Sequence, residues 1–186
     1  MGITERTYRT CTYIAGDWDG DKNAVDILHH WNESNHWGLS FKDVHDLTQS
    51  RDSSLNCSIK NSLRTRMNYS KTFVLIVGEH TNTVMSGACF LCSEYGNANN
   101  LSREYCNRGH WIDNRSYVKT ECDMALNDYN DGKIKILVLY NNTKVDRDKC
   151  PQAIRWVGSH VAMIYKGSDN KYYWNYDAVK QAFDSL

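Results

Sequence analysis

Glu121 lies in a stretch whose spacing could support chemistry on a bound ligand. If residues 114–125 form a helix, Val118 and Cys122 belong to an apolar stripe that packs on a sheet. Tyr117 and Glu121 then lie one turn apart along the edge of that stripe. The carboxylate could accept hydrogen bonds from ligand hydroxyl groups, and the ring could stack on a base. A solvated helix glutamate would show the same spacing, so the surrounding elements must decide between the two interpretations.

Two loops carry further residues that could line a binding site. The first holds acids around a tryptophan and the second follows a strongly apolar run; the candidates are Asp17, Trp18 and Asp19, and Gly78, His80 and Thr81. Acidic and aromatic side chains with few basic ones suit a ribose or a nucleoside better than a bare phosphate. For Asp17 and Asp19, turn formation and helix capping are an equally good explanation. The chain has no G-x-G-x-x-G and no Walker sequence.

The elements that would position these residues alternate between strands and helices. Runs of β-forming or apolar residues predict strands at 10–15, 39–44, 71–77, 134–140 and 160–165. The helical spacing of apolar residues predicts helices at 22–31, 59–67, 114–125 and 172–186. Because parallel neighbours need crossover connections, this alternation indicates an α/β fold. The expected architecture is a flavodoxin-like, doubly wound five-stranded parallel sheet with helices on both faces.

The predicted sheet places the candidate residues at one edge. Ligands bind beyond the carboxyl ends of the strands in such sheets. The two polar loops and the start of the Glu121 helix would meet there, which favours the functional interpretation of Glu121. A phosphoacceptor receiver domain shares this fold, but Val77 and Gly78 stand where its aspartate would be needed. That alternative therefore ranks last.

Length and composition narrow the class of protein. The 186 residues predict a single domain, 1–186. Lys plus Arg and Asp plus Glu balance at 22 each, which disfavours a nucleic-acid partner. The chain has no apolar signal segment and no apolar run near the roughly 18 residues of a membrane span, so we expect a cytoplasmic protein with no membrane partner. In that compartment the seven cysteines indicate free thiols or metal ligands before disulfides.

A polar stretch interrupts the alternation at residues 79–113 and is predicted to be an insertion. It contains Cys89-x2-Cys92, followed by Cys106 and His110, which could hold a structural zinc ion in a tetrahedral site. A segment with so few apolar residues would need such a clip to stay ordered. Ordinary free or buried thiols remain the alternative explanation, and Cys122 and Cys150 are alternative ligands.

The order of four segments resembles a known family. The strand TYIAGDWDGD, the strand KTFVLIVGEHT, the helix RSYVKTECDMAL and the strand KIKILVLYN are similar to the TIR-like domains of the Thoeris antiphage defence system of bacteria. The resemblance extends from Thr10 to Tyr165, apart from the insertion. Its most specific feature is an aromatic residue four positions before a glutamate, here Tyr117 and Glu121. TIR enzymes often carry tryptophan at the aromatic position, so tyrosine is a mild departure.

The resemblance implies cleavage of the bond between nicotinamide and ribose in NAD, with formation of ADP-ribose, a cyclic isomer or a conjugate. Glu121 would contact the ribose hydroxyls and stabilise the positive charge that develops on the sugar. Trp18 and Tyr117 would stack on the substrate, and the other loop candidates would shape the pocket. No metal is needed, because nicotinamide is already a cationic leaving group. The resemblance also implies a signal that activates a separate effector protein, and a homo-oligomer or filament as the active form.

A second function remains open on the sequence alone. A catalytically silent nucleotide-binding or TIR-type assembly module could use the same sheet edge to bind a ligand or a partner. The two functions differ in NAD turnover.

Overall fold

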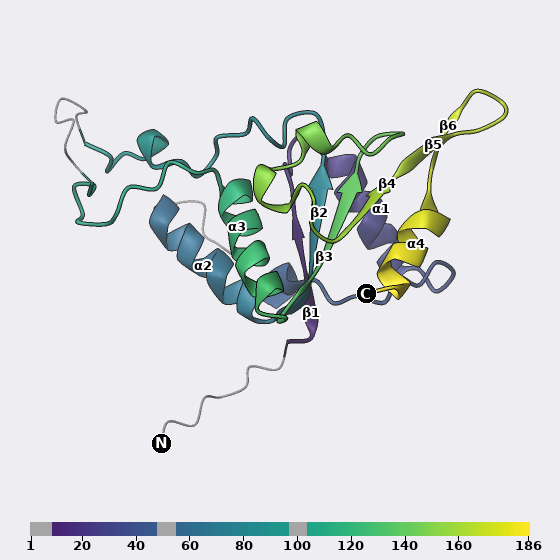
Figure 1. Ribbon diagram of the computed structural model, residues 1–186, viewed down its shortest axis with the longest axis horizontal. Coiled ribbons are helices and arrows are strands. Elements are labelled where there is room, and N and C mark those ends of the chain that lie inside the picture. The colour runs from purple at the N-terminus through teal and green to yellow at the C-terminus, as the bar shows by residue number, and fades with distance from the viewer. Residues whose placement is uncertain (1–8, 48–54, 97–103) are drawn as a thin grey trace, which may run out of the picture.

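A parallel sheet forms the centre of the molecule (Figure 1). The computed structural model describes residues 9–47, 55–96 and 104–186, without the side chains of residues 46 and 47. Within these residues the sheet has four strands in sequence order: β1 (Cys11–Ala15), β2 (Ser70–Val77), β3 (Lys135–Tyr140) and β4 (Ser159–Ala162). The three neighbouring pairs are all parallel. The carboxyl ends of the strands therefore share one edge, as the sequence predicts.

Two helices cover each face of the sheet (Figure 1). The helices α2 (Asn56–Asn68) and α3 (Tyr117–Asn130) pack on one face, and α1 (Lys22–Glu33) and α4 (Tyr176–Asp184) pack on the other. Side chains alternate along each strand, so Tyr13 faces α2 and α3, whereas Ile14 faces α1 and α4. The predicted two-sided α/β architecture is confirmed.

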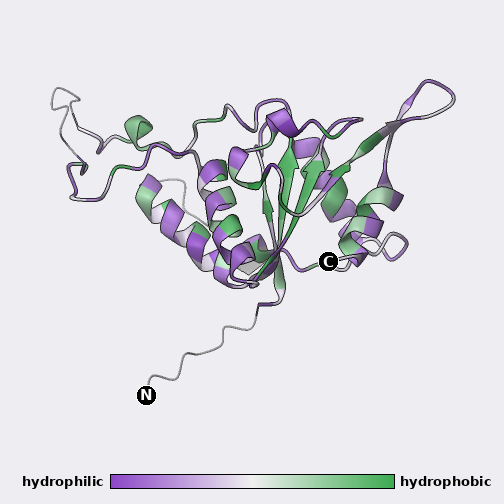
Figure 2. Cartoon of the chain, in the orientation of Figure 1, coloured by the Kyte–Doolittle hydropathy of each residue, from purple (hydrophilic) through white to green (hydrophobic). Residues whose placement is uncertain are grey.

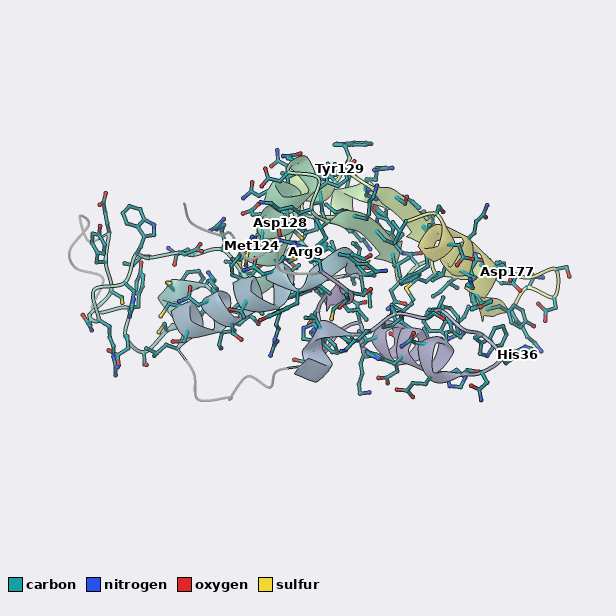
Figure 3. All side chains as sticks on the ribbon, turned by 90° about the horizontal axis from the view of Figure 1, so that it is seen from below. Arg9, His36, Met124, Asp128, Tyr129 and Asp177 are labelled. Atoms are coloured by element: carbon teal, nitrogen blue, oxygen red, sulfur yellow. The ribbon has the colours of Figure 1, made fainter. Side chains whose placement is uncertain are left out.

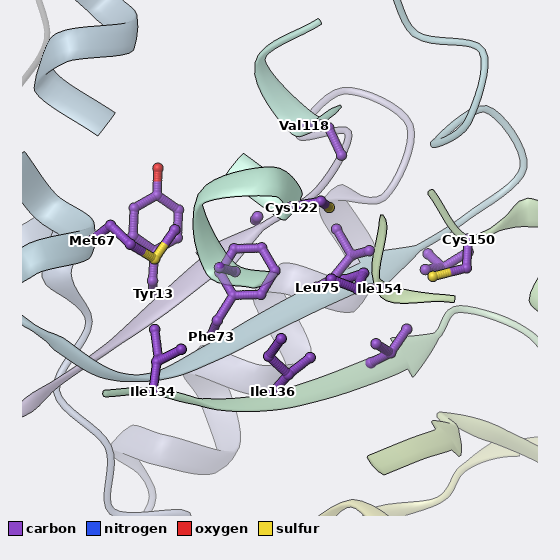
Figure 4. Packing of buried hydrophobic residues seen from close by; sticks show 14 of the residues in the cluster. Tyr13, Met67, Phe73, Leu75, Val118, Cys122, Ile134, Ile136, Cys150 and Ile154 are labelled. Atoms are coloured by element: carbon purple, nitrogen blue, oxygen red, sulfur yellow. The ribbon is translucent and has the colours of Figure 1, made fainter. Parts of the chain in front are cut away.

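The central strands hold most of the apolar core. Figure 2 shows the strands as the most hydrophobic part of the ribbon, while the helices carry polar residues along their outer surfaces. Residues 73–77 of β2 are all at most 1% exposed, and each such side chain contributes about 1.5–3 kcal/mol on burial. Figure 4 shows the ring of Tyr13 beside Met67 and Phe73 within this core. A rigid, two-sided core thus fixes the strand ends that carry the candidate loops.

The predicted strand at 39–44 is wrong. Only one parallel bridge forms there, between Thr12 and Asp43, and a short 3-10 helix, η1 (Val44–Leu47), follows it. Gly38 and Ser40 both adopt positive φ, 60° and 57°, which interrupts an extended backbone. The segment still lies against the outer edge of β1, at the place of the second strand in a flavodoxin-like sheet. The described sheet therefore has four strands and not the predicted five.

The C-terminal elements also differ from the prediction. The predicted strand at 160–165 divides into β4 and a separate strand β5 (Ile164–Lys166), which pairs antiparallel with β6 (Tyr172–Trp174). The turn between β5 and β6 closes through a hydrogen bond from Gly167 N to Lys171 O, and Asn170 adopts a φ of 64°. Helix α4 consequently begins at Tyr176, four residues later than predicted. Figure 1 shows this hairpin projecting from the sheet.

The described parts of the connections after β2 and β3 contain only short helices. Residues 78–96 and 104–116 carry η2 (Cys89–Leu91) and one antiparallel bridge, Tyr105 to Trp111, and these described parts extend away from the sheet in Figure 1. After β3 come η3 (Arg147–Lys149) and η4 (Gln152–Ile154). The division into one domain with an insertion at 79–113 stays a prediction. None of the helices in the described residues is both long and apolar enough to span a membrane.

Candidate functional site

A cavity of about 410 Å³ lies at the carboxyl end of β1, between α2 and α3. Its walls come from the loop after β1, from the two helices and from the segments around residues 45 and 85. The lining residues are Gly16, Asp17, Trp18, Asp19, His45, Ile59, Leu63, Arg66, Val84, Ser86, Tyr117, Val118 and Glu121. A cavity of about 610 Å³ at the amino ends of the strands contains lysines and none of the predicted site residues.

Glu121 is buried in the wall of the 410 Å³ cavity, with 7% of its surface exposed. The hydroxyl of Tyr13, at the middle of β1, donates a hydrogen bond of 2.6 Å to its Oε1. Burial raises the pKa of Glu121 to about 7, although the Tyr13 hydrogen bond and the positive charge of Arg66 oppose this shift. The carboxyl group therefore changes between its neutral and ionised forms near neutral pH.

Local sequence explains how α3 presents Glu121. Ser116 caps the helix by accepting a hydrogen bond from Lys119 N, and Val118 and Cys122 are buried against the sheet. The predicted helix with its apolar stripe is thus confirmed. The sequence predicts Glu121 at the edge of the buried face of α3. In the structure α2 packs against α3 on the side of Glu121, so this residue is buried.

Tyr117 lines the cavity and also ties three segments together. Its hydroxyl donates to Asn56 Oδ1 of α2 at 2.8 Å, and its backbone N–H donates to Ser86 O. The ring lies against the backbone of Gly87, where a Cβ would come within 2.4 Å of it and where φ is +91°. Only glycine fits this close approach. Tyr117 therefore fixes the wall of the cavity besides offering its ring to a ligand.

The loop after β1 forms part of the cavity wall. Asp17, Trp18 and Asp19 all line the cavity beside Glu121. Trp18 is 45% exposed, and its ring packs edge-on against His45 with centroids 5.5 Å apart. An accessible indole at the rim is well placed to stack on a base.

The structure does not bring Gly78, His80 and Thr81 to this cavity. Thr81 is buried and its hydroxyl accepts a hydrogen bond from Gly78 N at 2.8 Å, which closes the turn after β2. The carboxylate of Asp21 packs so tightly on Gly78 that a Cβ there would lie 1.9 Å from Asp21 Oδ1. His80 is exposed. The loop after β2 thus closes the turn at the end of that strand and does not form the cavity wall.

The sequence prediction missed several polar residues at or beside the cavity, among them Tyr13, Asp43, His45 and Arg66. Asp43 is 3% exposed, and its Oδ1 accepts hydrogen bonds from His45 Nδ1 at 2.8 Å and from the His45 backbone at 2.9 Å. Burial by itself raises the pKa of Asp43, but hydrogen bonds from His29 and His45 hold it well below its ordinary value. The sequence assigned 39–44 to a strand, whereas the structure holds Asp43 and His45 beside β1 through a single bridge from Thr12 to Asp43.

The predicted zinc ligands gather around a second, much smaller cavity of about 20 Å³. Cys89, Cys92, Cys106 and His110 line it together with Cys57 of α2, a further sulfur that the prediction lacked. Within residues 9–47, 55–96 and 104–186, however, no group of three or more His, Cys, Asp or Glu side chains is arranged so that it could hold a metal ion. The alternative ligands Cys122 and Cys150 lie in the apolar core. Zinc binding stays a prediction.

Comparison with known proteins bears on the family resemblance. Residues 11–85 match the family model described as Thoeris protein ThsB, TIR-like domain. The resemblance to Thoeris TIR-like domains is confirmed over these residues. The matched residues include β1, Asp43, His45 and β2 of this TIR-like segment, and they end before Glu121. The geometry of the cavity is what joins Glu121 to them.

Among solved structures, the chain is similar to a metazoan TIR-STING receptor from C. gigas in complex with 2',3'-cGAMP. The TM-score is 0.49 and the sequence identity is 14%, over 97% of this chain and 41% of that chain. This chain thus spans about two fifths of the length of that receptor chain. No curated protein matches it.

Proposed function

We propose that this chain is a TIR-like enzyme that cleaves the bond between nicotinamide and ribose in NAD. The observation that carries the proposal is the carboxyl group of Glu121, buried in the cavity wall and hydrogen-bonded to Tyr13. The product is an ADP-ribose-derived signal, cyclic or conjugated, that activates a separate effector in bacterial antiphage defence. The family match over residues 11–85 supports this biological setting.

The proposed chemistry depends on the ionised carboxylate of Glu121, which is buried in the cavity wall. The ribose hydroxyls donate hydrogen bonds to the carboxylate, which places the sugar beside it. As the bond to nicotinamide breaks, its electron pair leaves with nicotinamide and positive charge develops on the ribose. A buried carboxylate stabilises that charge more strongly than one in water, because the local dielectric constant is low.

The rim supplies binding groups for the rest of the substrate. Trp18 is accessible for stacking, and Asp17 and Asp19 offer acceptors for sugar hydroxyls. A cavity of about 410 Å³ suits the nicotinamide riboside half of NAD better than the whole molecule. We therefore expect a second copy of the chain to complete the site in a homo-oligomer or filament.

A catalytically silent nucleotide-binding or assembly module is the second candidate. The hydrogen bond between Tyr13 and Glu121 favours it, because a paired, buried carboxyl could serve only to join β1 to α3. This candidate binds NAD or ADP-ribose at the same cavity without releasing nicotinamide.

Nicotinamide release separates the two candidates. Purified protein is incubated with NAD over a range of protein concentrations, and in extracts of phage-infected cells, and nicotinamide is measured by chromatography. We expect Glu121→Gln to lower the rate by at least about 100-fold. The matched control is Glu33→Gln, which alters an exposed glutamate at the end of α1. Mass measurement of the second product distinguishes ADP-ribose, a cyclic isomer and a conjugate.

Two results would contradict the proposal. An unchanged rate in Glu121→Gln would remove Glu121 from the reaction. Binding of NAD without nicotinamide release, at every concentration and in infected extracts, would favour the silent module.

A further inference from the structure

Asp43 and His45 form an acid–base pair at the same cavity as Glu121. His45 lines the cavity, whereas Asp43 lies behind it with 3% of its surface exposed. The imidazole Nδ1 is 2.8 Å from Asp43 Oδ1, and the backbone N–H of His45 donates to the same oxygen at 2.9 Å. Two hydrogen bonds from one residue to one carboxylate oxygen set both the backbone and the ring of His45.

The surrounding contacts hold this pair in one orientation. Oδ2 of Asp43 lies 3.2 Å from His29 Nε2 of α1, so both carboxylate oxygens are engaged. The imidazole of His45 packs edge-on against Tyr13, with centroids 5.1 Å apart, and against Trp18. Tyr13 is also the residue that holds Glu121. The pair and Glu121 therefore share one rigid support on β1.

The hydrogen-bond pattern determines which ring nitrogen of His45 is available. An ionised carboxylate can only accept, so Nδ1 of His45 carries the hydrogen that points to Asp43. Nε2 of the neutral ring then has a lone pair. Among the hydrogen bonds of the described residues, those of His45 run through Nδ1 and the backbone and leave Nε2 for a ligand.

We propose that His45, oriented by Asp43, is the base that accepts a proton from the nucleophile attacking the ribose carbon. This role rests on the proposed cleavage of NAD. Nicotinamide departs with the electron pair of its bond to ribose; an oxygen of water, or of another hydroxyl, forms the new bond to that carbon; and its proton passes to His45 Nε2. Asp43 is a positioning residue that stabilises the resulting imidazolium.

The two sides of the cavity thus have different tasks. Glu121 stabilises the sugar cation and governs nicotinamide release, while His45 governs the capture of that cation. Among the described residues, the titratable or charged groups that contact His45 or its partner Asp43, or that share the cavity, are Tyr13, Asp17, Asp19, His29, Asp43, Arg66, Tyr117 and Glu121.

Kinetics of formation of the ADP-ribose-derived product test the base role. We expect His45→Gln to lower the rate about 100-fold. The control is His36→Gln, an exposed histidine beyond the end of α1 (Figure 3). A variant with the wild-type rate would overturn the proposal. His45 is partly exposed, so its replacement leaves the core intact.

Nitrogen NMR of the histidine rings tests the positioning role without turnover. We expect wild-type His45 to carry its hydrogen on Nδ1, Asp43→Asn to weaken this preference, and ADP-ribose to shift the His45 Nε2 signal. A hydrogen on Nε2, or no response to ADP-ribose, would overturn the proposal. If wild-type protein releases no nicotinamide, the proposed function fails and the base role fails with it. The NMR result still decides whether Asp43 orients His45 toward a bound ligand.

Discussion

At the scale of single residues, the pKa of Glu121 is set by burial and by its neighbours Tyr13 and Arg66. Burial favours the neutral acid, and the hydrogen bond from Tyr13 and the charge of Arg66 favour the carboxylate. The balance leaves a group that titrates near neutral pH. The proposed reaction uses only the ionised form, so activity should rise with pH through the pKa of Glu121.

Replacing Tyr13 tests this balance. Tyr13→Phe removes the hydrogen bond to the carboxylate, so the pKa of Glu121 rises further. We expect the acid limb of nicotinamide release to move upward by about one pH unit, with the rate at high pH less affected. Tyr129→Phe, at an exposed tyrosine of α3, is the control. A downward or absent displacement in Tyr13→Phe would show that the hydrogen bond does not favour the ionised form.

At the scale of elements, α3 is joined to α2 and to the connection that precedes it. Tyr117 bonds to Asn56 at the start of α2, and Asn56 Nδ2 donates to Ala88 O next to Cys89. Cys57 follows directly and lines the small cavity shared by the predicted zinc ligands. An ion at this cavity would therefore stiffen the wall of the 410 Å³ site from outside, without taking part in the reaction.

Metal analysis tests the predicted zinc clip. A zinc clip requires about one zinc ion per chain in freshly purified protein, and the loss of this ion together with thermal stability in Cys89→Ser. Asp113 N donates to the Cys89 sulfur at 3.2 Å, as backbone amides do to metal-bound thiolates, so this position is the most informative one. Cys122→Ala alters a sulfur in the core and should retain the metal. Wild-type protein without bound metal would end the idea.

At the scale of the whole molecule, titration of the site is linked to folding. The pKa of Glu121 is raised from 4.5 to about 7 in the folded chain. The folded state therefore binds more protons than the unfolded state between these values. The contribution of this group to stability is complete below about pH 4.5 and is lost as the pH rises through 7. Ion pairs such as that of Arg9 with Asp128, which lie near one another in Figure 3, act in the opposite direction, because they lower the pKa of Asp128.

The difference in the free energy of unfolding between wild type and Glu121→Gln isolates the contribution of Glu121. The neutral amide avoids the cost of a buried charge, so we expect the variant to gain stability relative to wild type between pH 5 and pH 8. The shift corresponds to a change on the order of 2–3 kcal/mol. Denaturant unfolding at the two pH values measures it. A difference that does not depend on pH would mean that Glu121 titrates normally in the folded chain.

The alternation of strands and helices was predictable from residue spacing. The buried strand at 71–77 and the helix that carries Glu121 depend on local periodicity, which a sequence displays directly. The same spacing placed Asp17, Trp18 and Asp19 at the correct sheet edge, because parallel strands point their carboxyl ends the same way. The strand at 39–44 failed because two positive φ angles override the β-forming residues around them.

The sequence by itself determined the kind of fold and pointed to Glu121 as the candidate acid. Only the tertiary structure decided which groups surround it. His45 lies at the cavity because a bridge from Thr12 holds the segment of Asp43 against β1, and Tyr13 reaches Glu121 from the middle of that strand. The pKa of Glu121 likewise depends on α2 covering α3, since burial is a property of packed elements and not of residue order. From the sequence, Glu121 was either a solvated or a ligand-binding helix glutamate. In the folded chain it is a buried acid that is hydrogen-bonded to Tyr13 of β1.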